Sequence, residues 1–379
     1  MRVAVDASRN RSGGAKAHLI GILKDGDPSL AGIQEVHVWS YQALLDQLPQ
    51  EPWLIKHSDP ALEKGLLSQL IWQRFVLPKE LDRLKCDALL STDAGTVCRY
   101  TPSVVMSRDM LSFEPGEMSR FKWSAAWCRL YLLRYMQIWS LRAATGQLYL
   151  TQYAATMISR YVRNDSNVRI VPHGVSDAFR HPPKADTAEP STELLLVCVS
   201  NADLYKHQWV LVEAVFRLRR EGFKARLRLV GAGDGRPAAV QKIHDAIGQY
   251  DPEGEFVELH GAVSHSRIAE LLTDSDVFVF SSSCENMPNT LVEGMSSGLP
   301  IACSNRGPMP EVLRDGGVYF DPESVDSVHA ALSEMLSSDQ LRQRLAERSK
   351  KYSEEFSWAR CAQETWAYLS HVSNAATKK

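Results

Sequence analysis

The sequence lacks the features that most directly assign a protein to a class. None of its seven cysteines forms a Cys-x-x-Cys pair, so neither a zinc ribbon nor a dithiol redox site is encoded. No stretch approaches the roughly 18 uninterrupted apolar residues that cross a bilayer. The first residues, MRVAVDASRN, lack the apolar core of a signal peptide. Cysteines that are scattered and odd in number are typical of a reduced compartment, so we expect a soluble, cytoplasmic protein.

A strong excess of charge of either sign is also missing. The 43 basic and 45 acidic residues give a formal net charge of −2, which disfavours nucleic-acid binding through overall positive charge. Glycine and proline are near average, which excludes a mainly disordered chain. At roughly 150 residues per domain, the 379 residues predict two domains, or at most three.

Short apolar runs alternate with helical patterns along the chain, most regularly in its second half. Segments such as 208–222 and 266–274, in which apolar residues recur every three or four positions, predict helices. This alternation predicts an α/β fold with a parallel sheet covered by helices on both faces. The expected strands are Arg2–Ala7, Glu35–Tyr41, Cys86–Thr92, Ser103–Ser107, Gln147–Thr151, Val168–Pro172, Glu193–Ser200, Ala225–Gly233, Glu255–Gly261, Asp276–Ser282 and Leu299–Ser304.

A break in the alternation indicates the domain boundaries. Residues 176–192 are rich in proline and polar residues and have no periodicity. We interpret them as a linker, with a long loop inside one domain as the alternative. Residues 1–175 and 193–356 are then two α/β domains. In the tail, 357–379, the amphipathic piece Trp358–Val372 is expected to pack back on the first domain.

The most informative stretch is residues 281–310, SSSCENMPNTLVEGMSSGLPIACSNRGPMP. Its pattern predicts a strand, a loop, a helix and a second strand. Asn286 or Asn289 can cap the helix, and Gly298, with a proline two residues later, ends it.

Two glutamates of this stretch fall where doubly wound sheets bind ligands. Glu285 lies in the loop beyond the carboxyl end of a strand, and Glu293 lies one turn inside the following helix. Carboxylates there can hold hydroxyl groups while amides at the helix start hold a phosphate. Two glutamates eight residues apart are weak support when taken alone, because solvated surfaces carry such pairs by chance.

In its context this pair resembles the E-x7-E signature of retaining, nucleotide-sugar-dependent glycosyltransferases of the GT-B type, group 1 or family 4. The resemblance extends from about Glu193 to Trp366. Residues 285–322, ENMPNTLVEGMSSGLPIACSNRGPMPEVLRDGGVYFDP, are similar to a subgroup that builds bacterial O-antigens and other surface polysaccharides, often from GDP-mannose. The resemblance implies two facing Rossmann-like domains with a deep interdomain cleft, the first binding the acceptor and the second the nucleotide sugar.

The resemblance also assigns roles in the second domain. Glu285 would bind hydroxyls of the transferred sugar and Glu293 the nucleotide ribose, while the backbone of 286–291 would face the sugar and the phosphates. The segment VSNADLYK resembles the family's G-R-L…K segment, which puts Lys206 on the donor diphosphate, where an ammonium stabilises the leaving group. A surface lysine is the alternative. Asn201 stands where many relatives carry arginine, so one leaving-group cation is missing or is supplied from elsewhere.

Two further segments of the second domain resemble donor-site loops. Gly231 lies in LVGAGDG, similar to the family's V-G-x-G turn, although a glycine cluster is equally often a tight strand-to-helix turn. Residues 259–263, LHGAV, would flank the base through main-chain groups and include Val263.

In the first domain the resemblance reaches two loops. Gly13 and Gly14 follow the first strand, where the family's loop reaches the diphosphate and acceptor; a tight turn is the alternative. Arg108 replaces the family's sugar-contacting histidine, which removes an acid/base role but suits a phosphate. Asp109 is expected to orient the acceptor hydroxyl, with a structural ion pair as the alternative. His173, in VPHGV, is expected to be structural.

Residues 118–147 combine five basic residues with six aromatic ones and contain no acidic residue. Such interleaving suits contact with anionic lipid headgroups, which would bring the protein to the cytoplasmic face of a membrane. A buried helix whose arginines reach outward explains much of the same pattern.

Taken together, these features predict a retaining hexosyltransferase of surface polysaccharide biosynthesis. The expected donor is GDP-mannose, with rhamnose or another hexose as alternatives, and the acceptor is a glycan or a polyprenyl-diphosphate-linked sugar. The reaction is expected on the front face of the sugar without a metal, since no Asp-x-Asp motif is present, and without another cofactor. Other GT-B enzymes (an epimerase or a phosphorylase) and a non-catalytic scaffold are the alternatives. The expected donor-binding residues are Gly13, Gly14, Arg108, Asn201, Lys206, Gly231, Val263, Glu285, Asn286, Asn289, Thr290, Leu291 and Glu293, and the expected catalytic residues are Glu285, Lys206 and Asp109.

Overall fold

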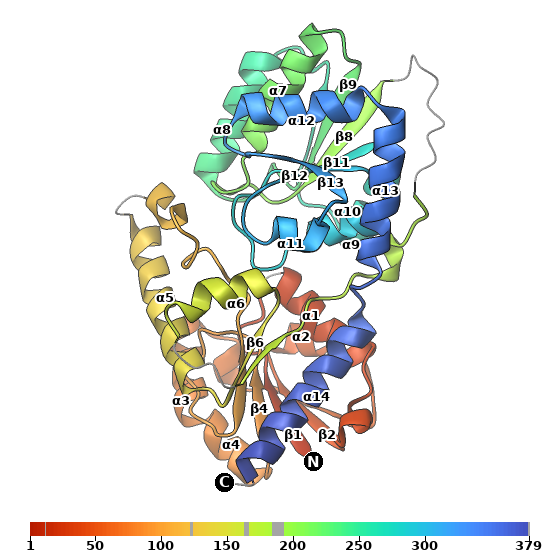
Figure 1. The fold of residues 1–379 in the computed structure, drawn as a ribbon. Helices are drawn as coiled ribbons and strands as arrows, with labels where there is room; N and C mark the ends of the chain where they lie inside the picture. Colours follow the sequence, from red (N-terminus) through yellow and green to blue (C-terminus); the bar gives the residue numbers. More distant parts are fainter. Residues whose placement is uncertain (12, 122–123, 163–166, 184–192, 378–379) are drawn as a thin grey trace. The chain divides into compact units, whose positions relative to one another are not determined.

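The computed structural model describes residues 1–11, 13–121, 124–162, 167–183 and 193–377. The chain divides into two compact units (Figure 1). Unit 1 comprises Met1–Gly174 and Ser357–Lys379, and unit 2 comprises Val175–Phe356. Of the expected linker, residues 176–183 lie within unit 2, and 184–192 lie outside the described residues.

Unit 1 is a seven-stranded, all-parallel sheet with helices, in the order β3-β2-β1-β4-β5-β6-β7. Its strands are β1 (Arg2–Asp6), β2 (Glu35–Trp39), β3 (Leu54–His57), β4 (Ala88–Ser91), β5 (Ser103–Met106), β6 (Gly146–Tyr149) and β7 (Val168–Ile170). Its helices are α1 (Gly13–Lys24), η1 (Pro28–Ala31), α2 (Gln42–Leu45), η2 (Pro60–Leu62), α3 (Leu66–Phe75), α4 (Leu77–Arg83), η3 (Glu117–Phe121), α5 (Ala125–Ala143), α6 (Gln152–Ser159) and α14 (Trp358–Thr377).

Unit 2 repeats this plan with six parallel strands in the order β10-β9-β8-β11-β12-β13. Its strands are β8 (Leu194–Val199), β9 (Ala225–Val230), β10 (Val257–His260), β11 (Val277–Phe280), β12 (Ile301–Ser304) and β13 (Gly317–Phe320). Its helices are η4 (Asp177–Phe179), α7 (Gln208–Arg220), α8 (Pro237–Tyr250), α9 (His265–Thr273), α10 (Asn289–Ser296), α11 (Met309–Leu313), α12 (Val325–Leu336) and α13 (Asp339–Ser353).

The predicted α/β class with two parallel sheets is confirmed, and each expected strand is present within one or two residues of its expected ends or slightly shorter. Two strands were missed, β3 and β13. Both are four-residue strands at the edge of a sheet and mostly half-buried. They lack the continuous apolar run that marks a strand buried on both faces, so the sequence pattern does not reveal them.

The last helix, α14, is part of unit 1, where it packs against α1, η1, β4 and β5. Trp366 on its inner face is fully buried. The Tyr368 hydroxyl donates to the Asn167 carbonyl (2.6 Å) and accepts from the Gln147 amide (3.1 Å). These bonds fix the helix beside the strands that the chain formed more than 200 residues earlier.

Helix α10 packs unusually close to strand β11. A Cβ atom on Gly294 would lie 2.7 Å from Cγ of Phe278, so only glycine allows this approach. The predicted helix end is confirmed, because Gly298 adopts a left-handed φ of +70° just past it. The predicted asparagine cap is wrong: Pro288 is the N-cap residue, and the helix begins at Asn289 without a side-chain cap.

This close approach predicts that substitution of glycine by alanine has opposite effects on the free energy of unfolding at two helical positions. Gly294→Ala should lower the free energy of unfolding by about 1–3 kcal/mol, because the added methyl must displace Phe278. Gly248→Ala in α8 meets no atom within 4 Å and should raise it by up to about 1 kcal/mol through helix propensity. Denaturant unfolding measures both, and equal effects would contradict the assigned packing.

Candidate active site

The candidate site of unit 2 lies where its sheet changes direction. From β8 the chain builds β9 and β10 on one side and β11, β12 and β13 on the other. The chain therefore continues in opposite directions along the sheet on the two sides of the neighbouring strands β8 and β11. Ligands of doubly wound sheets bind at this switch point.

Lys206 and Glu285 meet at this point. Lys206 follows β8, Glu285 follows β11, and Lys206 Nζ lies 2.5 Å from Glu285 Oε1. The two side chains are only 10% and 17% exposed. Lys206 is thus a largely buried, ion-paired lysine, and the alternative of a surface lysine is wrong.

Hydrogen bonds between the two loops hold this pair in place. Ser281 Oγ donates to the Lys206 carbonyl (2.6 Å), and the Ser283 amide donates to the Tyr205 carbonyl (2.8 Å). His207, which has a left-handed φ of +52°, places its Nε2 3.0 Å from Ser283 Oγ. The backbone on both sides of Lys206 is therefore tied to the loop that carries Glu285.

The loop after β8 is also tied to the loop after β9. The Ala202 amide donates to the Asp234 carbonyl (2.9 Å), and the Arg236 amide donates to the Ala202 carbonyl (2.8 Å). A Cβ on Gly235 would lie 2.2 Å from the Ala202 carbonyl oxygen, so glycine is required there. Gly231, with φ +82°, turns the chain out of β9 and donates its amide to the His260 carbonyl (3.0 Å).

Glu293 projects from α10 and is paired with a histidine that the sequence analysis missed. His265, the first residue of α9, places Nε2 2.8 Å from Glu293 Oε1. The hydrogen bond to this carboxylate raises the pKa of His265 despite partial burial. Glu293 Oε2 is buried and has no hydrogen-bond partner among the described residues. A buried acceptor of this kind is costly unless a ligand hydroxyl or water satisfies it.

The residues around the start of α10 differ in burial and in whether their backbone amides are hydrogen-bonded. Asn286 is buried, Asn289 and Thr290 are half-buried, and the Leu291 side chain is wholly buried. The amides of Asn289 and Leu291 donate to the Met287 and Pro288 carbonyls. Leu291 is thus a core residue whose amide is already engaged, which weakens its assignment as a donor contact.

Two other candidates of unit 2 lie at the same edge of the sheet. Asn201 follows β8 and is exposed, and Val263 follows β10 and is half-buried. The loop with Val263 is held by Asp234, whose carboxylate accepts the Ala262 amide (2.6 Å). The structure therefore gathers all the unit 2 candidates at the carboxyl edge of one sheet, where the side chains of Lys206, Glu285 and Glu293 are 10%, 17% and 12% exposed.

The remaining candidates lie at the corresponding edge of the unit 1 sheet. Gly13 and Gly14 begin α1 after β1, and Arg108 and Asp109 follow β5. Arg108 Nη2 donates to Asn10 Oδ1 (3.0 Å), and Asp109 Oδ1 accepts the Leu111 amide (2.9 Å). Burial lowers the pKa of Arg108 and raises that of Asp109. Ser12 lies outside the described residues.

Asn10 is a second residue that the sequence analysis did not single out. Besides Arg108, its side chain contacts Thr92 at the end of β4, whose hydroxyl donates to Asn10 Oδ1 (2.8 Å), and it donates to the Ala15 carbonyl in α1 (3.2 Å). It thus joins three loops of the edge. His173 stacks on His18 with ring centroids 4.8 Å apart, as part of the packing around α14.

The His265–Glu293 pair predicts a pH-dependent contribution to stability. A histidine whose folded pKa is raised stabilises the fold below its unfolded pKa of about 6.5, and this contribution is lost as pH rises through the folded value. His265→Asn should therefore lower the melting temperature near pH 6 more than near pH 9. In a Glu293→Gln background, His265→Asn should change the melting temperature equally at both pH values. If the pH dependence persisted there, it would have to come from a group other than the His265–Glu293 pair.

The model of the family "Glycosyl transferases group 1" matches residues 180–352. Among curated proteins, the chain is 32% identical over 110 residues to the O-antigen chain mannosyltransferase B of Escherichia coli, covering 29% of this chain and 29% of that protein. The chain spans between 27% and 51% of the length of the first curated relatives that it matches.

Solved structures match the whole chain at low identity. The sucrose-phosphate synthase of Thermosynechococcus elongatus superposes with a TM-score of 0.74 at 16% identity, covering 99% of this chain and 100% of that one. The Anabaena protein Alr3699/HepE in complex with UDP-glucose gives 0.69 at 16% identity, with 100% of both chains covered. Residues 180–352 are therefore similar to the group 1 glycosyl transferases, and the chain as a whole has the GT-B fold of two parallel-sheet α/β units.

Proposed function

We propose that this protein is a nucleotide-sugar-dependent glycosyltransferase of polysaccharide biosynthesis that moves a hexose to a glycan or lipid-linked acceptor. The observation that carries this proposal is the Lys206–Glu285 pair at the β8/β11 switch point, with Glu293 on the next helix. The group 1 family match over the same unit supports it.

The pair can serve donor binding because neither group is saturated by the other. Lys206 has three N–H donors and uses one on Glu285 Oε1, so it can also donate to a diphosphate oxygen. The second carboxylate oxygen of Glu285 can accept from hydroxyls of the sugar. The buried Glu293 Oε2 is suited to a ribose hydroxyl.

The chemical step we propose breaks the bond between the sugar carbon and the diphosphate oxygen and forms one to the acceptor oxygen on the same face. Lys206 would stabilise the charge that develops on the leaving diphosphate, which is the largest electrostatic demand of the transfer. The departing phosphate would take the acceptor proton. We propose that no metal takes part, and that Asp109 orients the acceptor and Arg108 faces a phosphate.

For the donor we propose GDP-mannose. One supporting observation is the similarity to the Escherichia coli relative, a mannosyltransferase of an O-antigen chain. The Anabaena structure holds UDP-glucose, so UDP-sugars are the competing class.

We also propose that residues 118–147 contact a membrane surface from the cytoplasmic side. Helix α5 in this range exposes Tyr131, Leu132, Tyr135 and Trp139, which supports this proposal over a helix that exposes only its arginines. Arg120 is paired with Glu117 and is not available to lipid. Among the described residues, no helix is both long and apolar enough to cross a bilayer.

Charge removal at the pair should abolish transfer while the fold survives. Glu285→Gln and Lys206→Met should each lower the turnover of the donor by about a hundredfold or more. Matched controls are Glu347→Gln and Lys351→Met on the exposed face of α13, which should leave turnover unchanged. Wild-type turnover in either site variant, with circular dichroism spectra intact, would refute the assignment.

Nucleotide specificity can be measured without knowing the acceptor. In a thermal-shift series, GDP and GDP-mannose should raise the melting temperature more than UDP and UDP-glucose at equal concentration, because only ligands of the native state stabilise it. Glu293→Gln should reduce this shift. A larger shift with UDP or UDP-glucose would indicate that the donor is a UDP-sugar and not GDP-mannose. A shift without any turnover would favour the non-catalytic scaffold.

A further inference from the structure

Helix α3, outside the segment that the sequence pattern singled out, carries an exposed apolar stripe. Leu67, Ile71 and Phe75 follow one another at intervals of four residues and are 72%, 51% and 61% exposed. Leu66 beside them is also exposed. Intervals of four place the three side chains on one face of the helix, and large apolar side chains gathered on one face mark an interaction surface.

Helix α5 carries a stripe of the same kind, and the loop that carries Arg99 connects the two helices. Tyr131, Tyr135 and Trp139 recur at intervals of four and are exposed. The guanidinium carbon of Arg99 lies 3.0 Å from the centre of the Trp139 ring. Burial, and next the positive charge of Arg74 on α3, lower the pKa of Arg99. Trp72 of α3 packs in one buried cluster with Cys98, the residue before Arg99, so the loop that carries Arg99 contacts both α3 and α5.

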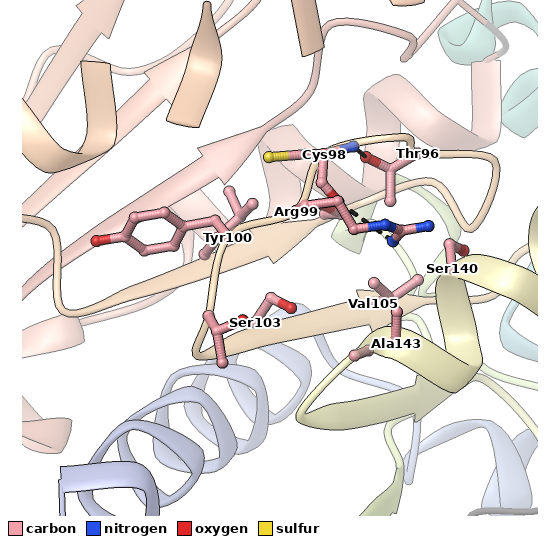
Figure 2. Close-up of a pocket in the computed structure, with 12 residues that line it drawn as sticks. Thr96, Cys98, Arg99, Tyr100, Ser103, Val105, Ser140 and Ala143 are labelled. Atoms are coloured by element: carbon pink, nitrogen blue, oxygen red, sulfur yellow. Dashed lines mark hydrogen bonds between the residues drawn. The ribbon is translucent and has the colours of Figure 1, made fainter. Parts of the chain in front are cut away.

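Arg99 also lines a small cavity (Figure 2). The cavity has a volume of about 50 Å³ and is lined in part by Ser91, Thr96 and Ser140. Figure 2 shows the Arg99 guanidinium lying between Thr96 and Ser140, while Tyr100 points away from it. Arg99 Nη2 and Ser91 Oγ are buried without a hydrogen-bond partner among the described residues. Donors left over in a cavity of this size suit one small oxyanion.

The charged residues of the two helices themselves are all basic. Helices α3 and α5 contain Arg74, Arg129, Arg134 and Arg142 and no acidic residue. No ion pair involves Arg74 or Arg99 in the described part of the chain. Exposed aromatic and aliphatic side chains flanked by unneutralised arginines match the chemistry of an anionic bilayer, whose acyl chains take the apolar groups and whose phosphates take the cations.

We propose that α3, Arg74 and Arg99 join α5 in one docking surface for an anionic phospholipid bilayer, with a headgroup phosphate bound at Arg99. This inference extends the proposed membrane contact of α5 and adds a second helix and a phosphate site. It does not depend on the sugar that the enzyme transfers.

The test is flotation of the full chain with vesicles of phosphatidylcholine alone or mixed with phosphatidylglycerol. The double variant Leu67→Ser/Ile71→Ser should bind mixed vesicles more than about tenfold more weakly, because two large apolar side chains lose their burial. The matched control is Leu30→Ser in η1, where Leu30 is 74% exposed but lies outside the surface. It should bind like the wild type.

Arg99→Gln tests the phosphate site separately. It should weaken binding to mixed vesicles about fivefold, as expected for one cation at an anionic surface. Arg267→Gln in α9, which removes an equal charge from unit 2, is the control. Equal binding of wild type and both surface variants, or equal binding to the two kinds of vesicle, would overturn the proposal.

Two further measurements separate this proposal from its alternatives. Sedimentation in the absence of lipid should show the same mass for wild type and Leu67→Ser/Ile71→Ser; a dimer that only the variant loses would make a second copy of the chain the occupant. Donor turnover with a water-soluble acceptor should be unchanged in all surface variants. A wild-type chain that floats with mixed vesicles but does not turn over donor would count against the proposed function and leave the docking surface intact.

Discussion

One ion pair governs the candidate site. Lys206 and Glu285 are each largely removed from water, and breaking such a buried pair costs about 3–5 kcal/mol because one charge is left uncompensated. The two residues lie 79 positions apart, so the pair forms only if the ends of β8 and β11 are held in register. The bonds from Ser281 and Ser283 to the loop of Lys206 supply that constraint, and the missing side chain of Gly294 lets α10 bring Glu293 to the same edge.

The same pair explains how a site can be charged and preorganised before a donor arrives. Each group compensates the other in the free protein, so neither is a solitary buried ion. The proposed donor would add partners of matching chemistry to the same two groups: anionic oxygens for the remaining N–H groups of the ammonium and hydroxyl donors for the second carboxylate oxygen. Glu293 is held in the same way by His265 through one oxygen only. Donor binding as proposed would therefore leave these pairs in place and require little movement of the backbone.

Structural features that depend on local sequence pattern could be predicted from the sequence. Buried strands such as β8 and β11 read as apolar runs, and Glu285, Glu293 and Lys206 could be named from a motif. Contacts between distant segments could not be derived. Nothing near His265 in the sequence indicates that α9 begins beside α10, and the use of Pro288 as the N-cap residue of α10 follows no capping preference. The edge strands β3 and β13 lacked the pattern that burial on two faces imposes.

Helix α3 is a further case in which the sequence pattern does not reveal the tertiary contacts. Its apolar residues at intervals of four read, in a sequence, as a core-facing stripe, because periodicity reports a face and not what covers it. In the fold the helix buries Gln69 and Gln73 together with Trp72, while Leu67 and Phe75 lie exposed. Gln73 stays inside because its amide donates to the buried Asp6 carboxylate of β1 (2.7 Å). This hydrogen bond holds the less apolar face of the helix against the sheet, so the more apolar face is exposed to water. Contact with a bilayer would remove the free-energy cost of that exposure.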